Sequence, residues 1–315
     1  MSFTTEVKQE VGMNILKPCC QKAELAALIQ LCSSLGMNSN GLYLTARIEN
    51  ASTAKRIWKL IRDQYDVKME LSVIRKMNLK KNNIYVIRVV GDVRHILDDL
   101  TLLKDGMIRN HPLATLVRKD CCARAYLAGA FMASGSVNSP SKTNYHLEIA
   151  TLNEKHAEYV QKLMERFLLP AKVIKRRNQY VVYLKASEKI ADFLKLIGAY
   201  ESLMKFEDVR IQRDYINSLT RLDNCEFANE VKTLKAGKKQ VESIELLEKH
   251  HRLQHLDSKL QEAARLRREN PEASLLELCE LYERETGNTI TKSGMKHRLA
   301  RLSELAENLK EDGEE

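Results

Sequence analysis

The segment YLAGAFMASG, residues 126–135, is the most informative part of this chain about its fold. It is apolar almost throughout, and its smallest side chains stand together at Ala128, Gly129 and Ala130. Because small side chains allow two helix backbones to approach closely, we expect this stretch to be a buried helix packed against a second helix. The alternative is an ordinary buried helix that contains alanines, and a second, matching helix would decide between the two.

The sequence supplies that second helix, because the stretch belongs to an internal duplication. KPCCQKAELAALIQLCS (17–33) aligns with KDCCARAYLAGAFMASG (119–135), with six identities in 17 positions. Ala26 and Ala27 are the small residues of the first copy. The identical pairs are Lys17/Lys119, Cys19/Cys121, Cys20/Cys122, Ala23/Ala125, Leu25/Leu127 and Ala26/Ala128.

The segments that follow the two copies also correspond. Period-2 runs with β-branched and aromatic residues predict strands, and 3.6-period runs predict helices. The sequence therefore predicts an α+β fold in which repeat 1 (1–105) and repeat 2 (106–200), each with about three strands, form one pseudo-twofold domain. The expected strands are 41–49, 68–76 and 83–91 in the first repeat and 144–151, 171–177 and 179–186 in the second; helices are expected around Ile57, from Asp92, over 154–167 and over 187–197.

The helix stretch resembles LAGLIDADG, the signature of the LAGLIDADG homing endonucleases. In that signature the next-to-last residue is an acid that holds the catalytic metal, and Mg²⁺ requires such hard oxygen ligands. Ser134 takes that place in the second copy and Cys32 in the first, while the neighbouring Gln30 and Met132 are neutral as well. We therefore expect no nuclease activity, with a displaced acid such as Glu148 as the alternative.

The doubled cysteines, Cys19–Cys20 and Cys121–Cys122, suggest zinc, since four thiolates would meet where the two helix starts converge. Adjacent residues on a helix point about 100° apart, however, and no CxxC spacing is present. We therefore favour small buried residues at a helix start over a zinc site, and we expect neither a metal nor a cofactor. Seven cysteines without a signal peptide or a membrane-spanning apolar run indicate reduced thiols in a cytoplasm.

Charge favours an anionic partner, because the chain of 315 residues carries a net charge of +9. Residues 1–220 hold 34 Lys+Arg against 22 Asp+Glu, whereas residues 221–315 hold 17 against 20. A surplus that only keeps the protein soluble is the alternative. On the predicted strands, the residues expected to contact DNA phosphates are Arg75, Lys76, Arg88, Lys172, Lys175, Arg176, Arg177 and Lys185.

The strand signals stop near residue 220, and a linker helix (201–222) is expected to lead into an all-α domain over 223–315. Within it, 274–307 has the layout of a helix-turn-helix: Ser274 and Glu277 form a capping box, and Gly287 allows a turn. A second helix from about Thr291 has an apolar stripe and an opposite polar face. We expect that helix to read DNA, unless its face is merely solvated, through Thr291, Lys292, Ser293, Lys296, His297, Arg298 and Arg301.

A degenerate LAGLIDADG domain followed by a helix-turn-helix resembles the WhiA family of bacterial sporulation and cell-division regulators. The matching segments include FTTEVKQE (3–10), NCEFANEVKT (224–233) and TKSGMKHRL (291–299). The resemblance implies a transcription factor, or a nucleoid-associated protein linked to cell division and chromosome segregation. We expect a cytoplasmic, monomeric binder of double-stranded DNA, with regulatory or division proteins as further partners. A residual nucleic-acid enzyme and a protein-binding adaptor remain as alternatives.

Overall fold

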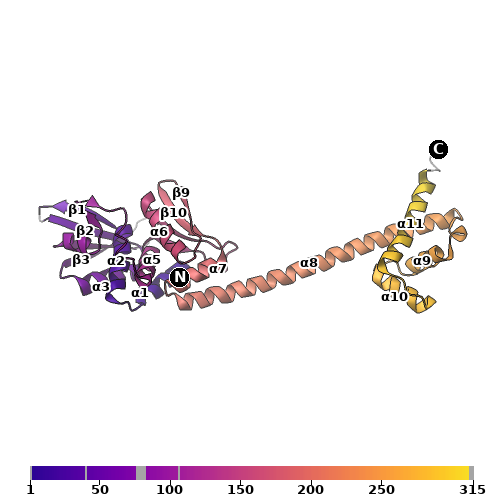
Figure 1. Cartoon of the computed structure of the whole chain (residues 1–315), viewed down its shortest axis with the longest axis horizontal. Helices are drawn as coiled ribbons and strands as arrows, with labels where there is room; N and C mark the ends of the chain where they lie inside the picture. Colours follow the sequence, from indigo (N-terminus) through magenta and orange to yellow (C-terminus); the bar gives the residue numbers. More distant parts are fainter. Residues whose placement is uncertain (1, 40, 76–82, 106, 312–315) are drawn as a thin grey trace. The chain divides into compact units, whose positions relative to one another are not determined.

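The computed structural model describes residues 2–39, 41–75, 83–105 and 107–311, which fall into two compact units. Unit 1 is Met1–Arg213 and unit 2 is Asp214–Glu315. Unit 1 contains two four-stranded sheets and the helices that pack on them, and unit 2 is helical (Figure 1). The predicted class, two LAGLIDADG-like α+β repeats followed by a helical region, is confirmed.

The centre of unit 1 is a pair of helices, α2 (Pro18–Cys32) and α5 (Asp120–Ser134), that lie side by side. They are the two copies of the duplicated segment. Their small residues are buried at the contact, and a β-carbon built on Gly129 would lie 2.5 Å from the carbonyl oxygen of Glu24. The two backbones therefore approach as closely as the small residues predict.

Each central helix is followed by an antiparallel sheet of the same topology. In repeat 1 the order is β1-β2-β4-β3, and in repeat 2 it is β7-β8-β10-β9. The prediction of about three strands per repeat missed β1 and β7, because each begins at the residue after its helix and lacks an alternating run of β-branched residues. The strands are β1 (Ser33–Asn38), β2 (Gly41–Ile48), β3 (Lys68–Arg75), β4 (Asn83–Val90), β7 (Gly135–Val137), β8 (Leu147–Thr151), β9 (Lys172–Arg176) and β10 (Gln179–Leu184).

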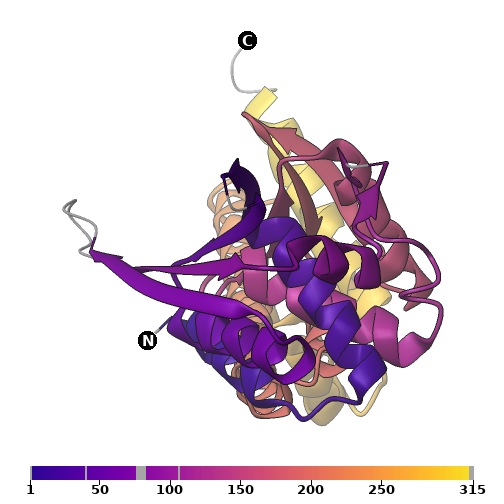
Figure 2. The ribbon, with the colours of Figure 1, turned by 90° about the vertical axis from the view of Figure 1, so that its left-hand side faces the viewer.

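One face of each sheet is covered by helices, and the opposite face is called the outer face here. In β2, Leu44, Ala46 and Ile48 are buried toward the helices, so alternate residues lie on the outer face. The far part of the β3–β4 hairpin extends beyond the helices (Figure 2). The remaining elements of unit 1 are α3 (Ala51–Gln64), α4 (Val93–Asp99), the small pair β5 (Leu103–Lys104) and β6 (Met107–Ile108), α6 (Glu154–Arg166) and α7 (Ser187–Leu196).

Two further helices contribute to unit 1, and the second of them continues into unit 2. The first, α1 (Phe3–Met13), was not predicted; its Glu10 carboxylate accepts hydrogen bonds from the backbone of Glu201 and Ser202 at the start of α8. The second, α8 (Tyr200–Lys249), is one continuous helix where the sequence suggested a linker helix and a separate helical run. Neither glycine nor proline interrupts residues 222–226, so the helix has no reason to stop there.

Unit 2 packs the end of α8 against α9 (Ser258–Glu269), α10 (Leu275–Thr286) and α11 (Lys292–Glu311). Gly237 lets α8 approach the loop after α9, since a β-carbon there would lie 2.2 Å from the carbonyl oxygen of Pro271. The same loop is held by buried Arg267, whose Nη1 donates to the carbonyl of Ala273 at 2.6 Å. Among the residues described, no helix is long and apolar enough to cross a membrane.

Candidate nucleic-acid interface

The ends of the two central helices are where the LAGLIDADG signature places its acids. Here α2 ends at Cys32 and α5 ends at Ser134. Burial raises the pKa of the Cys32 thiol to about 12, although nearby Lys8 acts in the opposite direction, so the thiol is neutral at pH 7. The Ser134 hydroxyl is buried and has no hydrogen-bond partner within the described ranges. Neither side chain offers the anionic oxygen that Mg²⁺ requires.

Lys8 of α1 adds a cation to this region. Its pKa is lowered to about 8 by burial, and its Nζ lies 5.9 Å from the centroid of the Phe131 ring. A lysine that is protonated over part of the neutral range would repel a divalent cation placed beside it. Nothing local in FTTEVKQE indicates that Lys8 faces the end of α2, so its position could not be predicted from the sequence.

The displaced acid considered above, Glu148, is already engaged. Its Oε2 lies 2.9 Å from His146 Nε2 and 3.6 Å from Arg176 Nη1. These contacts place it on the outer face of the second sheet, whereas the degenerate positions are at the helix ends. Of the other two neutral positions, Gln30 donates to the carbonyl of Arg109 at 3.1 Å, and Met132 is buried.

The outer face of the first sheet carries a basic and aromatic group. Strand register places Tyr43 opposite Val90 and Thr45 opposite Arg88, all on this face. The Arg88 guanidinium lies 4.3 Å from the centroid of the Tyr43 ring, which also covers Gly36. Arg88 is therefore on the outer face, as a phosphate contact would require.

Two other basic residues of this sheet differ from Arg88 in position. Arg75 alternates with Ile74 and lies on the opposite side of the hairpin, and Lys76 is outside the described residues. Arg47, which the sequence analysis left out, is exposed and lies on the outer face of β2. The alternation of GLYLTARIE already contained that signal, since Tyr43, Thr45 and Arg47 share one parity.

The basic residues of the second sheet are also divided between its two faces. Lys172 and Arg176 lie on the outer face, opposite Tyr183 and Gln179, whereas Lys175 lies on the other face with its Nζ 5.7 Å from the centroid of the Tyr180 ring. The remaining two are Lys185, which follows β10 with its Nζ 5.4 Å from the centroid of the outer Tyr183 ring, and Arg177, which lies in the β9–β10 turn with a φ of 56°.

The helix-turn-helix layout is present in unit 2. The Ser274 hydroxyl accepts from the Glu277 backbone while the Glu277 carboxylate accepts from the Ser274 backbone, so the capping box formed as expected. Gly287 ends α10 with a φ of 69°, a left-handed conformation that glycine adopts without strain. Thr291 then caps α11, because its Oγ1 accepts from the backbone of Gly294 at 3.1 Å.

Two of the seven residues expected on the DNA-reading face differ from the rest. Arg298 is half-buried, with its guanidinium 4.9 Å from the centroid of the Tyr282 ring of α10. Arg301 is exposed but ion-paired, since its Nη1 lies 2.7 Å from Glu304 Oε2. The other five are exposed on the first turns of α11: Thr291, Lys292, Ser293, Lys296 and His297.

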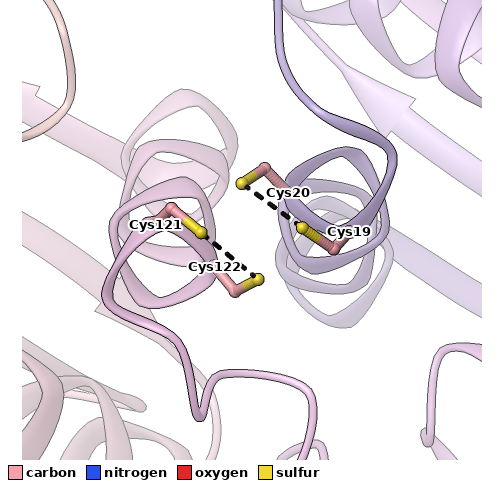
Figure 3. A group of neighbouring side chains, drawn as sticks. All are labelled: Cys19, Cys20, Cys121 and Cys122. Atoms are coloured by element: carbon pink, nitrogen blue, oxygen red, sulfur yellow. Dashed lines mark hydrogen bonds between the residues drawn. The ribbon is translucent and has the colours of Figure 1, made fainter.

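The doubled cysteines form one shared group, contrary to the expectation that they are only small buried residues at two helix starts. The sulfur atoms of Cys19, Cys20, Cys121 and Cys122 all lie within 4.8 Å of one another. They meet between the first turns of α2 and α5 (Figure 3). Adjacent cysteines diverge by about 100° on a single helix, but two such helices face each other here. One cysteine of each pair therefore points toward the other helix, and its neighbour lies beside it at the edge of the same group.

Comparisons with known proteins agree with this architecture. Residues 18–103 match the WhiA N-terminal LAGLIDADG-like domain, residues 123–215 the WhiA LAGLIDADG-like domain, and residues 219–306 the WhiA C-terminal HTH domain. "Probable cell division protein WhiA" of Bacillus licheniformis is 45% identical over 98% of each chain, and that of Oceanobacillus iheyensis is 44% identical over 98% of each chain. The fold is similar to the crystal structure of full-length DUF199/WhiA from Thermatoga maritima, with a TM-score of 0.60 at 23% identity over 98% of this chain and 99% of that one. The chain belongs to the WhiA family.

Proposed function

We propose that this protein is a non-enzymatic DNA-binding regulator whose helix α11 reads double-stranded DNA while the outer faces of unit 1 contact its backbone. The observation that carries the proposal is the exposed first part of α11. There Lys292, Ser293, Lys296 and His297 stand on a capped, well-packed helix-turn-helix. Recognition helices present their N-terminal residues to base edges in the major groove.

The exposed residues of α11 have the chemistry that this role requires. Lysine donates to guanine O6 and N7 or to phosphate, and serine contacts either base or phosphate. Arg301 would first exchange its surface ion pair with Glu304, which costs little because exposed pairs contribute about 0–1 kcal/mol. Arg298 is better explained as a residue that packs α11 onto Tyr282.

Unit 1 would add sequence-independent affinity. The chain's basic surplus lies wholly in residues 1–220. The basic residues on the outer faces of the sheets include Arg47, Arg88, Lys172 and Lys185. Each phosphate that such a residue neutralises adds about 0.9 to the slope of log affinity against log salt. Unit 1 would thus supply attraction, and α11 would supply selectivity.

The same proposal assigns no cleavage to the LAGLIDADG-like domain. Cys32 and Ser134 offer no anionic ligand, and buried Lys8 disfavours a cation near Cys32. The relatives' names, probable cell division proteins, support a role in cell division, with control of transcription or chromosome segregation as the means. The proposed location is the cytoplasm, in association with the nucleoid.

Paired lysine variants of the full chain test the role of α11. Lys292→Ala with Lys296→Ala should weaken binding and reduce the enrichment of selected sequences from a genomic DNA pool. A lost bidentate base contact costs about 1–3 kcal/mol. Lys232→Ala with Lys235→Ala, on α8 of the same unit, removes the same charge from two exposed positions. Equal effects of the two double variants, with the same selected sequences, would refute α11 as the reader.

A second pair of variants tests the outer faces. Arg88→Ala with Lys172→Ala removes two outer-face charges, whereas Arg75→Ala with Lys175→Ala removes two from the opposite faces of the same sheets. The first should lower the salt slope by about 1–2, and the second should leave it nearly unchanged. Unchanged slopes for both would favour the adaptor alternative, in which unit 1 binds protein partners.

A further inference from the structure

The group formed by Cys19, Cys20, Cys121 and Cys122, called the cysteine cluster, is not used by the DNA-binding proposal. Within each pair the sulfur atoms are 4.0 Å apart in α2 and 3.9 Å apart in α5, and all four lie within 4.8 Å of one another. The positions correspond in the two repeats, since each pair occupies the second and third residues of its helix. One compact group of four thiols therefore lies between the corresponding first turns of the two repeats' central helices (Figure 3).

These distances fit a single tetrahedral metal ion. Zinc–sulfur bonds of about 2.3 Å in a tetrahedron place the sulfur atoms about 3.8 Å apart, which is close to the separations within each pair. An iron–sulfur cluster contains several iron and sulfide ions, so it needs cysteines that are farther apart than those around one ion. Two interhelical disulfides would instead require sulfur–sulfur contacts of about 2.05 Å.

The surroundings of the cluster favour thiolates. The N-cap residues Lys17 and Lys119 have no side-chain capping bond, and the first turns of both helices direct their positive ends toward the sulfur atoms. A surface depression lined by Lys17, Cys20, Cys121 and Arg124 gives an ion access to the cluster.

Without a cation, the four thiols cannot all ionise. One thiolate can be stabilised by its neighbours, but each further negative charge within 4.8 Å would repel it. A soft divalent cation would offset that repulsion and so allow all four sulfur atoms to bind as thiolates.

We propose that the cysteine cluster binds one Zn²⁺ ion in tetrahedral tetrathiolate coordination. On binding, each sulfur still protonated releases its proton to solvent, and four thiolates with one divalent ion leave a net charge of −2. The two helix N-termini and the nearby lysines offset that charge. Because all four ligands are protein side chains, the site has no open position and is structural: it links the starts of α2 and α5 and hence the two repeats.

Metal analysis of the full-length protein tests the site. Protein purified without added metal or chelator should contain about one zinc per chain by mass spectrometry. Cys20→Ser with Cys122→Ser should lose that zinc, whereas Cys225→Ser, an exposed cysteine of unit 2, should retain it. Removing zinc from the wild-type chain with a mercurial and a chelator should lower the Tm reported by Trp58, and cobalt in its place should give the visible bands of a tetrahedral thiolate site.

Any other result of the metal analysis would overturn the zinc proposal. Zinc-free protein with seven reactive thiols would mean that the cluster is only a packing feature, and zinc-free protein with fewer thiols would mean disulfides. Iron with acid-labile sulfide would indicate a different centre. Zinc retained by the double variant would place the ion elsewhere. If the double variant fails to fold, the mercurial titration and the cobalt spectrum of the wild-type chain still decide the question.

Discussion

Replacing Gly129 with alanine tests how closely α2 and α5 approach. The new β-carbon would lie 2.5 Å from the carbonyl oxygen of Glu24 and 3.0 Å from the β-carbon of Ala27. Ordinary contact begins near 3.4 Å, so the helices would have to separate by nearly 1 Å or the backbone would have to bend. Overpacking of this kind costs about 1–3 kcal/mol, and more when the obstacle is backbone.

Helix propensity acts in the other direction, because alanine is favoured over glycine inside a helix by about 1 kcal/mol. We expect a net loss of about 1–2 kcal/mol in the free energy of unfolding, since the Glu24 carbonyl belongs to a helix packed on all sides. The single tryptophan, Trp58 of α3, lies against the core of unit 1 and reports this unfolding by fluorescence in a urea titration.

Gly12 provides the matched control. It lies in α1, and a β-carbon there would meet its nearest neighbour at 3.7 Å, which is an ordinary contact. Gly12→Ala should therefore be neutral or stabilising by up to about 1 kcal/mol. A Gly129→Ala protein as stable as Gly12→Ala would refute the close approach, and with it the account of why small residues occupy this helix.

Three further results are expected. Supercoiled and linear DNA should stay intact with Mg²⁺ or Mn²⁺, and nicking that disappears on mutating one acid would contradict this. Burial lowers the pKa of His156 to about 4 from 6.5 in the unfolded chain, so the unfolded state binds the extra proton below pH 6.5. The contribution of His156 to the free energy of unfolding should be full above that pH and fall by about 1.4 kcal/mol per pH unit toward pH 4. In His156→Gln, urea titrations should show a shallower decline of the free energy of unfolding with falling pH. Arg267→Ala should destabilise unit 2 by about 2–4 kcal/mol in thermal circular dichroism, through lost hydrogen bonds and a cavity, and leave the Trp58 transition unchanged.

The duplication made the fold predictable, because two matching helix segments with matching strands after them leave few architectures. What the sequence could not provide is contact between distant segments. Lys8 lies near Cys32 only because α1 packs against α3 and α5. The faces on which Arg75 and Arg88 lie depend on the register of the β3–β4 hairpin. Short strands that start directly after a helix, such as β1, lack the periodicity that would reveal them.

The cysteine cluster is another feature that depends on contact between distant segments and so could not be predicted from either segment alone. Each doubled cysteine, considered on its own helix, argues against a shared ligand set, since neighbouring side chains diverge. The pseudo-twofold arrangement brings two such pairs face to face, and all four sulfur atoms then lie within 4.8 Å of one another. The pairs together therefore form the ligand set that neither pair predicts alone. Corresponding side chains of α2 and α5 therefore face each other at both ends of the helix pair. At the C-terminal ends, two carboxylates would face each other and the negative ends of the helix dipoles, a cost that a neutral thiol and hydroxyl avoid. At the N-terminal ends the dipoles favour thiolates, and four thiols gather there.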